Sequence, residues 1–127
     1  LWGRIRLTQK DIRNVQLAKA AALAASRLLL AAAGTPPEDI RHVFIAGALG
    51  AHMDMEHFRR LGFIPAFPNA SFDYVGNTSL QAAVAACLDP CFIGHAATLR
   101  DRVQEVPLSG QEDFQDMFIR SLDFPGS

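Results

Sequence analysis

Two short apolar segments that each end at a glycine constrain this chain more than any other feature. The first is His42–Ala46, followed by a turn that holds Gly47 and Gly50, and the second is Ser71–Val75, followed by Gly76-Asn77. Glycine lets backbone N–H groups approach a ligand closely, because no Cβ stands in the way. A helix that begins just afterwards presents unsatisfied N–H groups to a phosphate or carboxylate. The two segments therefore predict two strand-to-helix corners that together make half of a nucleotide cleft.

Composition and charge narrow the class of protein. The 127 residues suffice for one domain with a real core, and half of them are hydrophobic while a fifth are charged, which excludes disorder. The net charge of −1 argues against a nucleic-acid partner. The apolar run Ala20–Ala33 is interrupted by Ser26 and Arg27 and is too short to span a bilayer, so it predicts a buried helix and no membrane partner. The chain opens in mid-pattern at Leu1 without a signal-peptide pattern, so we expect residues 1–127 to be a single domain cut from a longer protein.

A long helix is predicted near the N-terminus. Thr8 and Asp11 have the spacing of an N-cap and its acidic partner, and Gly34 is a natural residue to follow the helix, which should end at about Ala33. Helical spacing predicts an inward face and four side chains that point away from it. The inward face comprises Ile12, Val15, Ala22, Leu23, Ser26, Leu29 and Leu30, and the outward side chains are Lys10, Arg13, Lys19 and Arg27.

The remaining elements alternate between strands and helices. Further strands are expected at Arg4–Leu7 and Val103–Leu108, the latter at a sheet edge because Pro107 cannot donate to a ladder. Further helices are expected at Met55–Leu61 (capped by Asp54 and closed by Gly62), Thr78–Leu88, Cys91–Arg102 and Gln111–Leu122 (opened by the capping box of Ser109–Glu112). In the last helix, Phe114, Met117, Phe118 and Leu122 form the inward stripe. This alternation predicts an α/β fold with a few-stranded sheet and packed helices.

Several residues could carry chemistry or could be structural. Gly47, Gly50 and Gly76-Asn77 either contact a ligand or only permit tight turns. A second candidate is a group of residues of the types that bind metals: His52, Asp54, Glu56 and His57. Asp54 as an N-cap and Glu56 as an acid in the first turn of a helix explain the same residues without a metal.

Cys87 and Cys91 are the only cysteines, and they flank Pro90, which interrupts the helix. Two cysteines do not make a disulfide framework, so a reduced, cytoplasmic location is expected. The alternative is an iron–sulfur or zinc site that a second subunit completes.

Several segments in order resemble one family. Thr8–Ala20 resembles the "TQKDIRxxQLAKAA" segment of the corrinoid-activating reductive ATPases, and Val43–Gly50 resembles their "VYLAGGFG" corner. Ile64-Pro65 is similar to their "GLIP", Val75–Asn77 to their "VGN", and Asp113–Phe118 to their "DFQEEF". The resemblance covers nearly the whole chain.

The resemblance implies a fold and a function. Such RACo-like proteins join an N-terminal ferredoxin module with a 2Fe–2S cluster to an ATPase domain of the actin and Hsp70 (ribonuclease H-like) type. They use ATP with Mg²⁺ to help reduce a Co(II) corrinoid protein to Co(I), which returns a methyltransferase to service. By position, the nucleotide contacts would be Gly47, Ala48, Leu49, Gly50, Gly76 and Asn77, the first four on the adenosine side and the last two beside the hinge.

The resemblance implies that residues 1–127 are the C-terminal fragment of a larger multidomain protein, the parent protein. The expected activity belongs to this parent protein. The chain alone should bind no cofactor and not turn over ATP, because the resemblance places the phosphate, Mg²⁺ and cluster sites elsewhere. Its expected partners are a corrinoid protein of a methyltransferase system and a second copy of itself. Ala48 stands where the family has a second glycine, and Thr78–Gln81 replaces smaller residues. An alternative is therefore a non-catalytic dimerisation or docking module that pairs through Phe114, Phe118 and Leu122, with a degenerate nucleotide site. A third hypothesis is a cluster bridged between subunits by Cys87 and Cys91, as in related dehydratase activators.

Overall fold

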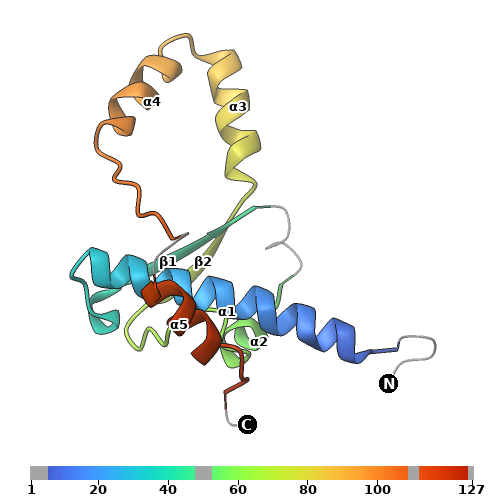
Figure 1. The fold of residues 1–127 in the computed structure, drawn as a ribbon. Helices are drawn as coiled ribbons and strands as arrows, with labels where there is room; N and C mark the ends of the chain where they lie inside the picture. The colour runs from blue at the N-terminus through green and yellow to red at the C-terminus, as the bar shows by residue number, and fades with distance from the viewer. Residues whose placement is uncertain (1–5, 48–52, 109–111, 126–127) are drawn as a thin grey trace.

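A computed structural model describes residues 6–47, 53–108 and 112–125, and Figure 1 shows its helices and strands. The elements, in chain order, are α1 (Gln9–Ala32), a short 3₁₀ helix η1 (Pro37–Asp39), β1 (His42–Ala46), α2 (Met55–Arg60), β2 (Ser71–Gly76), α3 (Thr78–Leu88), α4 (Phe92–Arg100) and α5 (Glu112–Arg120). Helices and parallel strands alternate, so the predicted α/β class is confirmed.

The first helix begins and ends where its capping residues predict. The side chain of Thr8 accepts a hydrogen bond from the Asp11 N–H at 3.3 Å, and the Asp11 carboxylate accepts one from the Thr8 N–H at 2.9 Å. The Thr8 hydroxyl also donates to the Asp11 carboxylate at 2.6 Å, and this bond, followed by the one from the Thr8 N–H, holds the pKa of Asp11 below its ordinary value. Gly34 follows the helix with a φ of 60°, a conformation that glycine adopts without strain.

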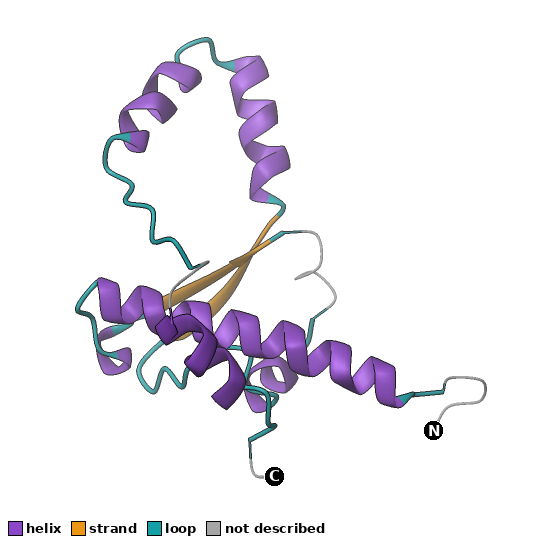
Figure 2. Ribbon diagram, in the orientation of Figure 1, coloured by secondary structure: helices purple, strands orange, loops and turns teal. Residues whose placement is uncertain are grey.

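β1 and β2 form a parallel pair whose register runs from His42 beside Ser71 to Ala46 beside Gly76, with one irregularity before Ala46. α1 lies over one face of this pair (Figure 2), since Leu23 of α1 and Phe72 of β2 line a common cavity. We predicted that His42–Ala46 is buried, and this is wrong. Phe44 is 64% exposed, because no described element covers the opposite face of the pair.

The core lies between α1, α5 and the loop after α2. Its buried apolar residues are Ala20, Leu23, Ala24, Leu28 and Phe67. The predicted inward face of α1 shares only Leu23 with this set, and Leu29 is 51% exposed. The buried stripe is therefore rotated about the helix axis towards its small alanine side chains, which let α5 approach closely.

Lys19 lies in this core, although the sequence predicted an outward position. Its side chain is 1% exposed, and its ammonium donates hydrogen bonds of 2.5 Å to the main-chain carbonyls of Ser121 and Asp123. Both carbonyls lie just after the end of α5, where the chain is no longer helical and buried main-chain carbonyls need other partners. Burial lowers the pKa of Lys19, while the charge of Asp123 opposes this effect and that of Arg27 reinforces it. Lys19 thus fastens the end of α5 to α1.

α3 and α4 project from the end of β2, away from α1 and α5 (Figure 1). Their large apolar side chains, with Val103 just beyond, are exposed: Leu80, Val84, Leu88, Ile93, Leu99 and Val103.

The bounds of α3 match the prediction, and α4 is shorter than the predicted Cys91–Arg102. The predicted edge strand Val103–Leu108 is wrong, because this segment forms no strand and the sheet of the described residues consists of β1 and β2.

Two predictions concern the ends of the chain: the strand Arg4–Leu7 and the helix Gln111–Leu122. Arg6 and Leu7 form no strand, and the rest of the predicted strand Arg4–Leu7 lies outside the described residues. Residues 109–111, which include most of the predicted capping box, also lie outside them. The final helix is observed as α5, two residues shorter at its C-terminal end than Gln111–Leu122.

Within the described part of the chain, α1 is long and apolar enough to cross a membrane, by length and composition alone. It buries Lys19 and four apolar residues, and α5 packs against it. This burial is the pattern of a core helix.

Candidate functional site

The two glycine-bearing bends lie side by side at the carboxyl edge of the strand pair. The Gly47 N–H donates a hydrogen bond of 2.9 Å to the carbonyl of Gly76. Their φ angles are 102° and 80°, values that side chains with a Cβ rarely adopt. Parallel strands end at the same sheet edge, and open α/β sheets bind ligands there. The structure therefore brings together two of the predicted site residues that are 29 positions apart.

Two side chains that the sequence did not single out hold these bends in place. The Tyr74 hydroxyl donates to the Gly47 carbonyl at 2.8 Å, and the Gln81 side-chain amide donates to the Val75 carbonyl at 3.3 Å. The same Gln81 nitrogen would lie 3.0 Å from a Cβ at Gly76. A tyrosine at the end of a strand could have been recognised as a candidate tether, whereas the role of Gln81 depends on the path of the chain.

Asn77 begins α3. Its side-chain oxygen accepts a hydrogen bond of 3.1 Å from the Leu80 N–H, so it acts as the N-cap. This cap is local, because it joins residues three positions apart, and it helps to fix the direction in which α3 leaves β2.

The bend at Gly47 has free space beside its backbone, as far as the neighbouring residues are described. A Cβ on Gly47 would meet no heavy atom of the described residues within 4 Å beyond its chain neighbours. The predicted contacts Ala48, Leu49 and Gly50 lie outside the described residues, as does His52.

α2 begins as predicted, at Asp54. Its carboxylate accepts hydrogen bonds from the N–H groups of Glu56 at 2.9 Å and His57 at 3.1 Å. The bond from His57 is the first cause of a lowered pKa for Asp54. Asp54 is thus the N-cap of α2. In the described ranges no group of three or more His, Cys, Asp or Glu side chains could hold a metal ion.

Cys87 and Cys91 lie on either side of the break between α3 and α4. Both are free thiols and both are exposed. A 2Fe–2S cluster takes four protein ligands, usually cysteine thiolates, and this chain has two cysteines, so it cannot hold such a cluster alone.

Comparison with known proteins identifies the family. Residues 2–127 match the family described as the C-terminal domain of RACo, the ASKHA domain. The chain belongs to this family. Its fold is accordingly the C-terminal part of an ATPase domain of the actin and Hsp70 type, which confirms the fold and the family that the sequence predicted.

Individual relatives agree with this assignment. A solved structure titled reductive activator for corrinoid, iron–sulfur protein superposes with a TM-score of 0.84 and 32% sequence identity, over 94% of this chain and 19% of that one. A Co(II) methylated amine-specific corrinoid protein reductase from Methanosarcina barkeri is 27% identical over 94% of this chain and 22% of its own length. The corrinoid activation enzyme RamQ from Eubacterium limosum is 37% identical over 58% of this chain and 12% of its own length. The chain thus spans about a fifth or less of these relatives.

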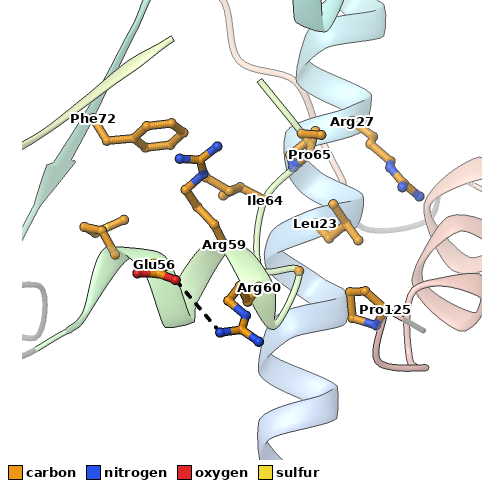
Figure 3. A pocket seen from close by; sticks show the side chains of 12 residues that line it. Leu23, Arg27, Glu56, Arg59, Arg60, Ile64, Pro65, Phe72 and Pro125 are labelled. Carbon is orange, nitrogen blue, oxygen red and sulfur yellow. Dashed lines mark ion pairs between the residues drawn. The ribbon is translucent and has the colours of Figure 1, made fainter. Parts of the chain in front are cut away.

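A cavity of about 880 Å³ lies between α1, α2 and β2, and Figure 3 shows the side chains around it. Its walls include Leu23 and Arg27 of α1, Arg59 of α2 and Phe72 of β2. Neither Gly47 nor Gly76 lines it. The two bends and this cavity are therefore separate features of the domain.

Proposed function

We propose that this chain is the C-terminal ATPase-type domain of a reductive activator of corrinoid proteins, and that it supplies the adenosine-side wall of the nucleotide site. The observation that carries the proposal is the hydrogen bond between Gly47 and Gly76. It sets two bends without side chains beside each other at the edge where parallel sheets bind ligands. The family assignment supports the same reading.

The residues of the two glycine-bearing bends are suited to contact one side of a bound nucleotide. Among the described residues no heavy atom beyond the chain neighbours lies within 4 Å of a Cβ position on Gly47, which leaves room for a planar group, and Asn77 caps α3, which begins at the same edge. Gly47, Ala48, Leu49 and Gly50 would contact the adenosine, while Gly76 and Asn77 would lie beside the hinge between two lobes. The phosphates and Mg²⁺ would be held by residues of the parent protein outside this chain, and ATP binding or hydrolysis there would be coupled to electron delivery.

The proposed partner is the Co(II) corrinoid protein of a methyltransferase system, and the proposed location is the cytoplasm. The named relatives are a corrinoid protein reductase and a corrinoid activation enzyme, which supports the partner. The electrons would come from a 2Fe–2S cluster in another domain of the parent. Four cysteines with ferredoxin spacing in the parent sequence would support this source, and their absence would leave only the ATPase part of the proposal.

A pair of glycine variants tests the nucleotide contact. Gly47 and Gly34 both have positive φ, and a Cβ on either would meet no described heavy atom within 4 Å beyond its chain neighbours, so a valine at either puts a side chain on a left-handed backbone without a clash with the described residues. Gly34 follows α1, outside the proposed site. In the parent protein, Gly47→Val should weaken binding of a fluorescent ATP analogue at least tenfold, while Gly34→Val should leave it unchanged. Equal affinities for the two variants would contradict the proposal.

Calorimetry of MgATP with the 127-residue chain adds an independent test. A chain without the phosphate and Mg²⁺ ligands should bind MgATP with a Kd of about a millimolar or weaker. This corresponds to a binding free energy of about −4 kcal/mol or a less negative value. Micromolar or tighter binding would show a complete site and refute a half-site.

A second candidate function is a dimerisation or docking module. The apolar side chains exposed on α3 and α4 favour it, because contiguous exposed apolar surface commonly marks an interface. Phe114, Phe118 and Leu122, which the sequence suggested for subunit contact, are half-buried. Light scattering distinguishes the candidates: a dimer that Leu80→Glu converts to a monomer supports the module, and a monomer at high concentration refutes it.

A further inference from the structure

We propose that the cavity between α1, α2 and β2 is a binding site for a small organic anion, separate from the proposed nucleotide wall. Its volume of about 880 Å³ lies within the range of small-molecule sites, roughly 300–1,000 Å³. Three elements and the loop after α2 contribute to its walls, so the fold rather than one mobile side chain creates the hollow.

The walls provide an apolar surface for the body of a ligand. Leu23 comes from α1, Phe72 from β2, and Ile64 and Pro65 from the loop between α2 and β2. Pro125 of the C-terminal segment closes one side, packed against the end of α2 so closely that a Cβ on Gly62 would lie 2.9 Å from its ring. An aromatic or branched aliphatic group could remove this surface from water.

The rim is cationic. Arg27, Arg59 and Arg60 line the cavity together with a single acid, Glu56. Glu56 pairs with Arg60 at 3.9 Å, and both side chains are largely exposed. Across the described residues, Arg27 and Arg59 have no carboxylate within ion-pair distance. Two guanidinium groups therefore remain available to an anion.

Arg59 is positioned for this role. Its guanidinium lies 4.6 Å from the centroid of the Phe72 ring, a cation–π contact that Figure 3 shows at the edge of the cavity. This contact with the ring face does not use up the N–H donors of the guanidinium, so those that point away from the ring can donate to a ligand. These donors match the oxygens of a carboxylate or phosphate. Arg27 stands on α1, on the Pro65 side of the cavity and across from Arg59, so positive charge lies at two places on the rim.

The ligand is thus an acidic group on an apolar, preferably planar, body. 1-Naphthyl phosphate has this chemistry, and 1-naphthol is its neutral counterpart. We would titrate both into the protein by calorimetry with saturating MgATP present, so that the proposed nucleotide site cannot account for the heat. The expected result is saturable binding of 1-naphthyl phosphate with a Kd below a millimolar and binding of 1-naphthol at least tenfold weaker.

Matched arginine variants locate the site. Arg27→Gln and Arg59→Gln should each weaken binding about tenfold or more, since a hydrogen bond to a charged group contributes roughly 1.5–3 kcal/mol. Arg100→Gln removes the same charge from α4, outside the cavity, and should have no effect. The three arginines are exposed, so the variants should keep the fold, which circular dichroism would verify. Absent binding, equal binding of 1-naphthol, or equal effects of Arg59→Gln and Arg100→Gln would each overturn the proposal, whatever the affinity for ATP.

Discussion

Replacing Lys19 by methionine should destabilise this domain by detaching α5 from α1. Methionine keeps most of the aliphatic length of lysine and removes the ammonium. That ammonium donates to the carbonyls of Ser121 and Asp123 in a place where the lysine side chain is 1% exposed. The variant would leave both carbonyls without this donor, and because Ser121 is buried, water would reach its carbonyl only if the end of α5 moved.

The size of the effect follows from two opposing contributions. Hydrogen bonds to charged groups contribute roughly 1.5–3 kcal/mol each, so two of them give about 3–6 kcal/mol. Burial of the charged ammonium is unfavourable, which is why burial lowers the pKa of Lys19. The methionine variant has no charge to bury, and this offsets part of the loss in the free energy of unfolding. We therefore expect a net loss of about 2–4 kcal/mol in the free energy of unfolding.

Urea unfolding followed by circular dichroism measures this loss. Lys10→Met is the matched control, because Lys10 lies on the same helix and is exposed, and it should change the free energy of unfolding by less than about 0.5 kcal/mol. Hydrogen exchange should also become faster at the amides of α5 in the Lys19 variant. If Lys19→Met matched the control in both measurements, the idea that this buried ammonium fastens α5 would be wrong.

Three further predictions concern the caps and bends. Gly62→Ala should lower the free energy of unfolding by about 1–3 kcal/mol in urea titrations, because φ is 77° and the new Cβ would lie 2.9 Å from Pro125; an unchanged midpoint would refute that contact. Asn77→Ala should cost about 1 kcal/mol and fray the first turn of α3, whereas Asn77→Asp should retain the cap, as amide exchange would show. The lowered pKa of Asp54 implies that its stabilising contribution is complete above the ordinary carboxyl pKa and disappears as the pH falls through the lower, folded-state pKa. An NMR titration of the Asp54 carboxyl carbon that gave an ordinary pKa would contradict the cap.

The local features of this fold could be predicted from sequence because their causes are local. The capping pair of Thr8 and Asp11, the cap at Asp54 and the helix Thr78–Leu88 each depend on residues within one or two turns. The two strands were also recognised, since each combines β-forming residues with a glycine at its end. The adjacency of the two bends followed from the general rule that parallel strands end at one edge.

The errors arose where distant residues decide the outcome. Helical spacing placed Lys19 outside, but α5 supplies carbonyl partners 102 and 104 positions away. β1 was expected to be buried, but no described element covers Phe44. Val103–Leu108 was expected to be an edge strand, but among the described residues no strand pairs with it. A cationic rim around an apolar hollow, such as that formed by Arg27 and Arg59, likewise has no signature in a linear pattern.

The most direct test of the nucleotide proposal is an NMR titration of the ¹⁵N-labelled protein with MgATP, read at individual backbone amides. Saturable shifts at Gly47, Gly76 and Asn77, with those of α4 unchanged, are what a shared adenosine-side contact predicts. Shifts confined to other parts of the chain, with these three amides unmoved at saturation, would contradict it.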